Sequence, residues 1–169
     1  MATTTQPTTE REHYLASFER EYQTTLRLLK AYPPAQGKLK FVDRSHTANE
    51  IAWTLVISQM VVEPILTVPK LEPMPMPAPD DFKAILGQFE KAHANVSAKL
   101  AKLDEKTFQS AITMPAGPGG VTASVRRADA LWMMLFDTVH HRGQFSVYLR
   151  ASGAKVPSIY GPSGDEPWM

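Results

Sequence analysis

The first part of the chain carries apolar residues at the spacing of one helix face. Between Glu10 and Ala31 they recur every three or four positions, and charged residues stand between them. Tyr32 is followed by Pro33 and Pro34, and proline cannot continue a helix because it lacks an N–H and its ring blocks the preceding turn. We therefore predict a first helix over residues 10–31. Its buried stripe would be Tyr14, Leu15, Phe18, Tyr22, Leu26 and Leu29.

A second helix is predicted from about Ala48 to Val62. Thr47 and Glu50 have the spacing of a capping box, in which the threonine hydroxyl and the glutamate carboxylate accept hydrogen bonds from free amides at a helix start. Residues 51–57 are apolar on nearly every side of such a helix. A helix of this kind is buried on most sides, so we expect little of it to meet solvent.

The rest of the chain alternates connectors with two further predicted helices. Residues 64–79 contain six prolines, which argues against regular structure and predicts an extended crossover. A third helical stripe runs from Phe82 to about Lys106, and residues 114–120 predict a second flexible connector. The last helix is expected from about residue 122 to 152, with Gly153 at its C-terminal cap.

Four helices with these connectors predict an all-α fold. The architecture would be an antiparallel four-helix bundle with a long proline-rich crossover between helices two and three. A chain of 169 residues has the length of one domain. We expect residues 10–169 to form that domain and the threonine-rich residues 1–9 to be a disordered tail. The core is expected to contain Trp53, Phe89, Leu131 and Leu135.

Composition argues against several classes of function. The chain has 18 basic and 17 acidic residues, a net charge of +1, and no block of like charge, so no nucleic-acid or anionic-membrane partner is indicated. Residues 51–57 form an apolar run that is too short to span a membrane, and we expect no membrane association. Cysteine is absent, which removes thiolate ligands and a cysteine nucleophile. Its absence is typical of the reducing cytoplasm, where we expect the protein.

Asp137 and His141 on the last predicted helix are the best candidates for chemistry. They stand four residues apart, so they project from one face one turn from each other, as two ligands of one divalent metal would. Met134, Phe145 and Tyr148 recur on that face. A carboxylate and an imidazole among such groups must be paired, ligated or hydrogen-bonded. A metal site and a simple Asp–His hydrogen bond in a polar pocket both satisfy this condition.

Two stretches of the sequence resemble the DinB-like proteins. One is HHRGQFSVYLR at residues 140–150 with VPSIYGP at residues 156–162, and the other is RSHTANEIAW at residues 44–53. The resemblance covers helices two to four in order and spacing. It implies a four-helix bundle, often dimeric, in which three side chains bind a divalent metal. These are one histidine from helix two and, on the last helix, a second histidine preceded four residues earlier by a histidine or an acid.

The resemblance places the metal ligands at Asp137, His141 and Thr54. The helix-two histidine should follow Trp53, where this sequence has Thr54. A threonine hydroxyl is a poor ligand for zinc or nickel because it is neutral and keeps its proton, so we expect weak or absent binding of either metal. His46 lies eight residues before Thr54, about 12 Å along a helix axis, and could replace the missing ligand only if the helix start bends. Its other interpretation is a surface histidine in the loop.

Neighbouring polar residues are interpreted as supporting groups. His140 points about 100° around the helix from His141, so we expect it to pack against another helix or to hydrogen-bond to a ligand. Arg142 and Gln144 are expected to hold the connectors or the C-terminal tail through backbone carbonyls. His93 has no partner of metal-ligand type one turn away and is interpreted as a hydrogen-bonded core or boundary histidine.

Two hypotheses about function follow. The resemblance implies a metal-dependent enzyme similar to DinB-like small-thiol transferases and isomerases, in which the metal activates a low-molecular-weight thiol. Thr54 weighs against this hypothesis, whereas the retained Asp137 and His141 weigh against complete loss of the site. The alternative is a non-catalytic bundle that binds a small ligand or a protein partner. The resemblance and the apolar excess on the second and last helices also predict a homodimer.

Overall fold

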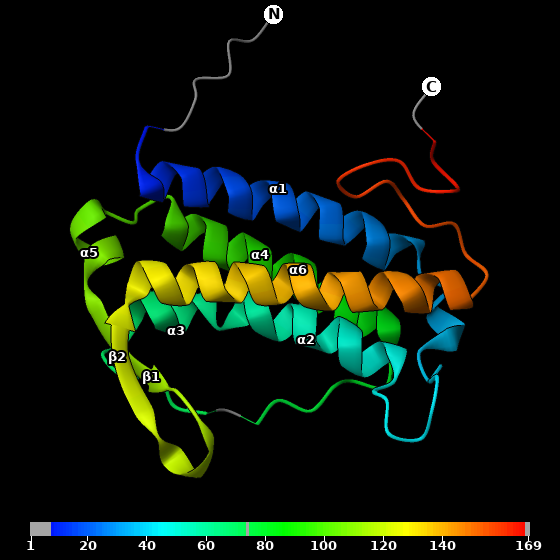
Figure 1. Cartoon of the computed structure of the whole chain (residues 1–169), viewed down its shortest axis with the longest axis horizontal. Coiled ribbons are helices and arrows are strands. Elements are labelled where there is room, and N and C mark those ends of the chain that lie inside the picture. The colour runs from blue at the N-terminus through cyan, green and yellow to red at the C-terminus, as the bar shows by residue number, and fades with distance from the viewer. Residues whose placement is uncertain (1–7, 74, 168–169) are drawn as a thin grey trace, which may run out of the picture.

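The structure, a computed structural model, is a bundle of four long helices with a two-stranded hairpin at one end (Figure 1). It describes residues 8–73 and 75–167. The all-α four-helix bundle predicted from the sequence is therefore confirmed. The long helices are α1 (Glu10–Ala31), α2 (Ala48–Met60), α4 (Phe82–Leu100) and α6 (Arg127–Ala151).

Local sequence signals set the ends of these helices. Thr9 and Thr47 each accept a hydrogen bond from the third amide of their helix, and the side chains of Glu12 and Glu50 accept one from the backbone N–H of Thr9 and Thr47, so both are capping boxes. Thr9 falls within the predicted tail, whose residues 1–7 lie outside the described residues. At the other end of the chain, α6 is followed by Gly153, whose φ of 78° suits a residue without a side chain.

Several short elements differ from the predictions. The predicted connector at 114–120 belongs to a β-hairpin, and the predicted start of the last helix at 122 lies in its second strand. The predicted third helix ends at Leu100, six residues early, and a separate short helix follows it. Buried Ile112 and Met114 alternate with more exposed residues, which is the period of a strand. The short elements are α3 (Val62–Thr67), α5 (Glu105–Gln109), β1 (Ala111–Pro115), β2 (Thr122–Arg126) and the 3₁₀ turns η1 (Pro34–Gln36) and η2 (Pro118–Gly120).

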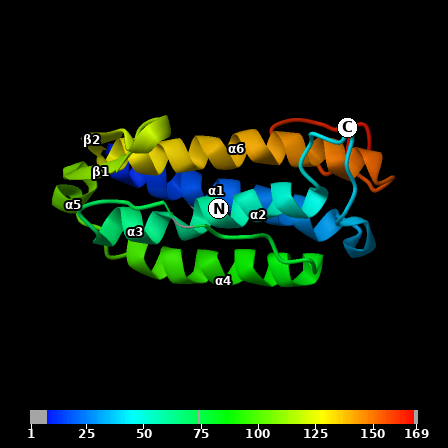
Figure 2. The ribbon, with the colours of Figure 1, turned by 90° about the horizontal axis from the view of Figure 1, so that it is seen from below.

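The order of helix directions differs from a simple antiparallel bundle. Helix α2 runs antiparallel to α6 but parallel to α4, and α1 runs parallel to α6 but antiparallel to α4 (Figures 1 and 2). Two consecutive parallel helices need a connection as long as the bundle. The proline-rich crossover predicted from the sequence provides it, although Pro64 itself lies in α3.

The crossover is fixed to the bundle along its length. The Trp53 indole N–H donates to the Met76 carbonyl at 2.6 Å, and the Asn49 side-chain amide donates to the Asp80 carbonyl at 2.7 Å. Near its start, the Leu71 N–H donates to the Thr113 carbonyl of β1 at 2.8 Å. The extended segment therefore packs along one side of the bundle.

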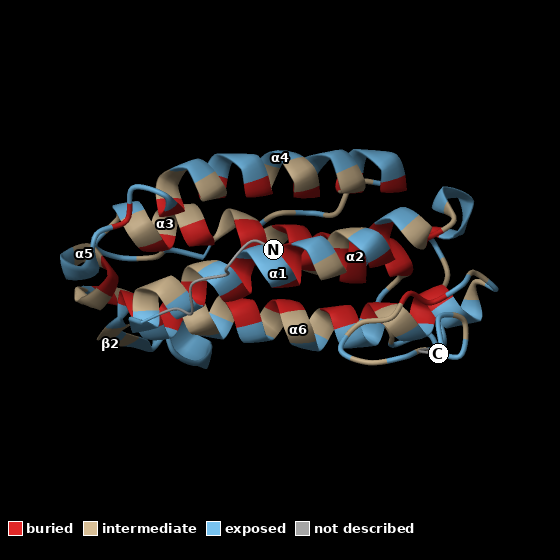
Figure 3. Cartoon of the chain, turned by 90° about the horizontal axis from the view of Figure 1, so that it is seen from above, coloured by how far each residue is buried: buried red, intermediate tan, exposed pale blue. Residues whose placement is uncertain are grey.

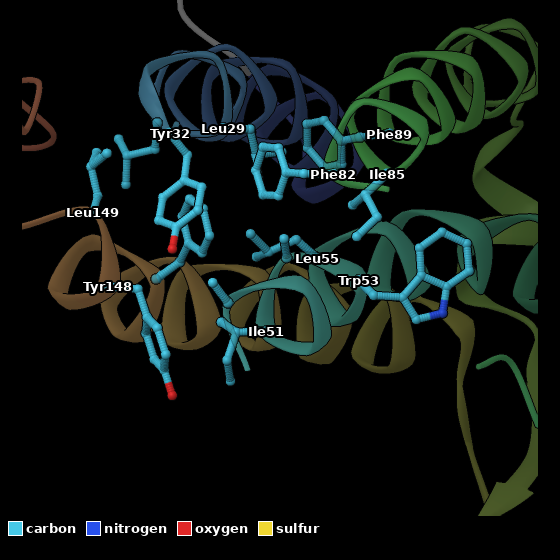
Figure 4. Packing of buried hydrophobic residues seen from close by; sticks show 14 of the residues in the cluster. Leu29, Tyr32, Ile51, Trp53, Leu55, Phe82, Ile85, Phe89, Tyr148 and Leu149 are labelled. Atoms are coloured by element: carbon cyan, nitrogen blue, oxygen red, sulfur yellow. The ribbon is translucent and has the colours of Figure 1, made fainter. Parts of the chain in front are cut away.

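The core runs the length of the bundle between the four helices. Figure 3 shows buried residues on the inward faces of the helices and exposed residues on their outward turns. In Figure 4, Leu55 of α2 and Phe82 and Phe89 of α4 meet in the interior. The core residues predicted from the sequence, Trp53, Phe89, Leu131 and Leu135, are all buried.

Residues 48–67 are more apolar than the sequence prediction allowed. This segment, which forms α2 and α3, is long and apolar enough to pass as a membrane span by length and composition alone. In the structure it packs against both α6 and α4, and most of α2 is buried. The position of α2 against both α6 and α4 accounts for its apolar composition, whereas only Val62 and Ile65 of α3 are buried.

Candidate functional site

The predicted pair on α6 lies at the seam between α6 and α2. His141 Nε2 is 3.3 Å from Asp137 Oδ1. From α2, the Ser58 hydroxyl lies 2.7 Å from Asp137 Oδ2 and can donate to it. The side chains of Asp137 and His141 are 37% and 21% exposed. The pair is therefore open to small molecules, at the edge of the bundle and not in its core.

A glutamine one turn further along α6 fixes the His141 ring. Gln144 Oε1 is 3.0 Å from His141 Nδ1, and Gln144 Nε2 is 3.1 Å from His140 Nε2. With the amide assigned in this orientation, its oxygen accepts a hydrogen bond from His141 Nδ1–H. In the neutral form of His141 the Nε2 lone pair then points at the carboxylate of Asp137. Two acceptors facing each other require a proton or a cation between them.

Thr54 lies opposite His141 across the same seam. In antiparallel helices, one turn back on α2 corresponds to one turn forward on α6. Starting from the Ser58–Asp137 contact, this step leads to Thr54 and His141. The Ser58 hydroxyl also lies 3.0 Å from the Thr54 carbonyl, and the Thr54 hydroxyl donates to the carbonyl one turn earlier at 3.0 Å. We call Thr54, Ser58, Asp137 and His141 the seam site.

The seam site offers two strong metal ligands. A tetrahedral zinc ion with bonds of about 2.0–2.1 Å holds neighbouring ligand atoms about 3.3 Å apart, which matches the separation of Asp137 Oδ1 and His141 Nε2. The remaining groups, Thr54 and Ser58, are neutral hydroxyls. Within residues 8–73 and 75–167, no cluster of three His, Cys, Asp or Glu side chains has the arrangement of a metal site. The seam site therefore has two side chains that could ligate a metal ion strongly, one fewer than the family resemblance implies.

The other histidines named in the sequence analysis lie outside the seam site. His140 is exposed, and its ring meets the His141 ring edge-on at 4.9 Å. His46 stands in the loop before α2 with its side chain 70% exposed, 3.9 Å from Glu50. Its backbone carbonyl accepts a hydrogen bond of 2.6 Å from the Tyr148 hydroxyl. The structure thus brings His140 to the edge of the site and leaves His46 at the far end of the seam.

His93 is a buried residue on α4, away from the seam. Its Nε2 lies 3.0 Å from a carboxylate oxygen of Glu19 and 3.1 Å from the Ser97 hydroxyl. Its ring stacks on Tyr22 with centroids 3.3 Å apart. Burial lowers the pKa of His93 below its usual value, and the charge of Glu19 only partly opposes this effect. The interactions are those of a packed, hydrogen-bonded histidine.

Arg142 points to the opposite side of α6, into the bundle. It is 1% exposed and pairs with Glu21 of α1 at 2.7 Å. It also donates to the hydroxyl of Tyr160, which fixes the C-terminal segment. Burial raises the pKa of Glu21, but hydrogen bonds from Tyr160 and Arg142 outweigh it, so the pKa of Glu21 lies below its usual value. Arg142 therefore joins α1, α6 and the C-terminal segment, and does not contact Asp137 or His141.

Sequence reasoning did not identify Ser58, Glu21 or Tyr160. For Ser58 a signal existed, because it stands one turn after Thr54 and shares its helix face. Tyr160 stands in the C-terminal stretch VPSIYGP that the family resemblance includes, but its partner Glu21 is 139 residues away and had no signal, since only the packing of the C-terminal segment on α1 brings the two together.

A cavity larger than any at the seam lies elsewhere. It has a volume of about 660 Å³ and lies between α1 and α6, with Trp132 and Phe136 in its wall. These residues are on the side of α6 away from Asp137. The carboxylate–imidazole pair lies on the other face of the helix, so this cavity is separate from the seam site.

The sequence matches one protein family along nearly its whole length. The DinB family model matches residues 1–168. A curated relative, the uncharacterized protein YrdA of Bacillus subtilis (strain 168), is 26% identical over 157 residues, which cover 92% of this chain and 90% of the relative.

Solved structures share the fold at low sequence identity. A DinB-like protein from Bacillus cereus ATCC 10987 matches with a TM-score of 0.71 and 23% identity, over 88% of this chain and 97% of its own. YfiT from Bacillus subtilis is described as a probable metal-dependent hydrolase with an unusual four-helix bundle topology. It matches with a TM-score of 0.64 and 13% identity, over 92% of this chain and 94% of its own. The mycothiol-dependent maleylpyruvate isomerase has a TM-score of 0.56 and 13% identity over 88% of this chain and 65% of its own.

Proposed function

The chain belongs to the DinB family, and from this premise we propose that it binds a divalent metal ion together with a small thiol, as a metal-dependent thiol transferase of the DinB type. The ion would be held by Asp137 and His141. The observation that carries the proposal is the approach of His141 Nε2 to Asp137 Oδ1 at 3.3 Å, with Gln144 accepting from the other ring nitrogen. Two acceptors that face each other are suited to share a cation.

The descriptions of two proteins with the same fold support the proposed dependence on a metal ion and a thiol. YfiT is described as probably metal-dependent and the maleylpyruvate isomerase as mycothiol-dependent. Their identities to this chain are 13% each, so the likeness is one of fold. The chemistry of the seam site must therefore carry the proposal by itself.

The chain supplies two strong ligands, which leaves coordination positions for external groups. When bound, the ion would lower the pKa of a small thiol and so favour the nucleophilic thiolate. Gln144 would keep His141 Nε2 directed at the ion, and Ser58 would orient the Asp137 carboxylate through its 2.7 Å contact. With only two side-chain ligands, the metal should be held firmly only when the thiol completes the shell.

A second function is favoured by one specific observation. Both carboxylate oxygens of Asp137 and both ring nitrogens of His141 have protein partners within 3.3 Å. A protonated His141 would satisfy the cluster without any ion. In that state the seam site is a polar pocket of a non-catalytic bundle that binds a small ligand or a protein partner.

Calorimetric titration of the tag-free protein with zinc, with and without 2-mercaptoethanol, distinguishes the two functions. We expect weak zinc binding alone and at least tenfold tighter binding with the thiol, after correction for the zinc–thiol complex in solution. His141→Ala should abolish both, whereas His93→Ala, a buried histidine outside the seam, should change neither. A zinc affinity that does not respond to the thiol would refute the thiol-dependent function. No zinc binding under either condition would favour the metal-free bundle.

A further inference from the structure

A second cavity continues the seam beyond the Thr54 and His141 positions. It has a volume of about 340 Å³. Ile51 precedes Thr54 by three residues on α2, and Gln144 follows His141 by three on α6, so both lie one turn further along the same antiparallel seam. Its principal lining residues are Arg44, His46, Ile51, Gln144, Val147 and Tyr148.

The walls of this cavity combine apolar surface with cations. Ile51 and Tyr148 come from α2 and α6, as Figure 4 shows, and Phe41 packs edge-on against the Tyr148 ring at 4.6 Å. Arg44 is exposed and forms no ion pair with another residue in the described ranges. An unpaired guanidinium beside an apolar pocket is a suitable partner for a carboxylate on a short apolar body.

Hydrogen bonds within the loop and to α6 support the turn that carries Arg44. The Ser45 hydroxyl accepts hydrogen bonds from the amides of Phe41 and Val42 at 3.1 and 3.2 Å. The Tyr148 hydroxyl donates to the His46 carbonyl at 2.6 Å and ties the loop to α6. Arg44 therefore projects from a fixed turn, which reduces the entropy lost when it binds an anion.

An acidic side chain, Glu50, stands beside His46, one of the residues that line this cavity. Glu50 is 3.9 Å from His46. Its carboxylate already accepts from the Thr47 amide and hydroxyl at 2.6 and 2.9 Å, and these bonds hold the pKa of Glu50 below its usual range. Glu50 is therefore engaged by the helix cap and by His46, and Arg44 is the lining residue that forms no ion pair within the described ranges.

We propose that this cavity is a subsite for the carboxylate end of a small organic ligand whose other end reaches the seam site. Gln144 links the two, because it lines the cavity and contacts His141 Nδ1 at 3.0 Å. The distance from His141 to Tyr148 along α6 is about 10 Å, the length of a small carboxylic acid with a short chain. The reach to the seam site rests on the proposed function, whereas the carboxylate subsite does not.

Nuclear magnetic resonance titration of the full chain with hexanoate tests the carboxylate subsite. Hexanoate should shift the amide signals of Gln144 and of residues 44–46, and neutral hexanamide should bind at least tenfold more weakly. Arg44→Gln should weaken hexanoate binding by about tenfold, whereas Lys102→Gln, which removes an exposed cation from the far end of the bundle, should not. Equal binding of hexanamide, or equal behaviour of the two variants, would overturn the subsite.

A third probe, 6-mercaptohexanoate, tests whether the subsite and the seam site act together. If they do, zinc should tighten its binding at least tenfold but leave hexanoate unchanged, and His141→Ala should remove the gain. If zinc has no effect, the link to the seam site is wrong, and the zinc titration with 2-mercaptoethanol decides the proposed metal function separately. Arg44-dependent binding of hexanoate would still establish the subsite in that case, so the two failures are distinguishable.

Discussion

Arg142 of α6 and Glu21 of α1 form an ion pair of 2.7 Å although their side chains are only 1% and 5% exposed. The Glu21 carboxylate also accepts from the Tyr160 hydroxyl at 2.7 Å, and Arg142 donates to the Glu21 carbonyl and the Thr25 hydroxyl at 3.3 Å each. A buried charge is tolerated only when its partners are present. This cluster therefore makes the packing of α1, α6 and the C-terminal segment interdependent.

Removing the charge of Arg142 should destabilise the protein strongly. In Arg142→Met, Glu21 stays buried without its cation, which should lower the free energy of unfolding by about 3–5 kcal/mol. Arg150→Met is the matched control on the same helix, because the Arg150 side chain in its ion pair with Asp165 is 53% exposed and the pair should contribute under about 1 kcal/mol. Urea unfolding of the two variants measures both values. Equal losses would show that the buried pair has no special role.

Glu21 should also make stability depend on acid pH. Its pKa in the folded protein lies below the usual value of 4.5. A carboxyl with a lowered pKa stabilises the fold fully above its unfolded pKa, and this contribution is lost as pH falls through the folded pKa. The difference in unfolding free energy between the native protein and Glu21→Gln should therefore shrink as pH is lowered below about 4.5. Urea unfolding between pH 3 and 6 measures it, and a constant difference would contradict the lowered pKa.

Local signals explain which features could be predicted from the sequence. Thr47 and Glu50 predicted a helix start that depends on four adjacent residues, and Pro33 predicted a helix end. The hairpin was missed because its strands are five residues each and stabilise each other only when paired. A connector rich in proline and glycine separates the two strands. Each strand alone is too short to give a clear alternating pattern in the sequence.

The candidate site divides in the same way. The one-turn spacing of Asp137 and His141 predicted their contact, because both lie on one helix. Ser58 contacts Asp137 from 79 residues away, and only the antiparallel packing of α2 on α6 brings it there. Adjacency in the sequence did not show which side chains share the site. Arg142 directly follows His141, but its side chain points into the bundle.

The predicted homodimer should form through the cavity of about 660 Å³ between α1 and α6, which we call the groove. The apolar residues of α2 lie mostly inside the bundle, whereas Phe136 of α6 is 64% exposed at the groove. Arg20 and Asp129 lie at opposite ends of the groove. A two-fold axis through its middle would therefore bring Arg20 of each copy against Asp129 of the other. We therefore expect the native protein to be dimeric at micromolar concentration and Phe136→Glu to be monomeric.

Sedimentation equilibrium tests this association. Val121→Glu is the control, because Val121 is 57% exposed in the hairpin, outside the groove, and its substitution should leave the dimer intact. A native protein that sediments as a single species of 18.8 kDa would exclude the dimer. Dissociation by Val121→Glu but not by Phe136→Glu would place the interface elsewhere.

The replacement of Thr54 by histidine is the most direct test of the seam site. Thr54 lies opposite His141 in the register fixed by the Ser58–Asp137 contact, so a histidine there would add a third strong ligand. Zinc affinity without any thiol should rise by more than about 100-fold, since the new imidazole supplies a full coordinate bond in a site that already holds two ligands. Calorimetric titration of the native protein and Thr54→His measures the gain.

Two further variants decide how this result is interpreted. Adding His141→Ala to Thr54→His should abolish the gain, and adding His93→Ala should preserve it. If Thr54→His binds zinc no better than the native protein, positions 54, 137 and 141 do not face one another and the register derived from Ser58 is wrong. If the native protein already holds a stoichiometric ion, another side chain completes the shell, and His46, the histidine nearest the start of α2, is the first to replace with alanine.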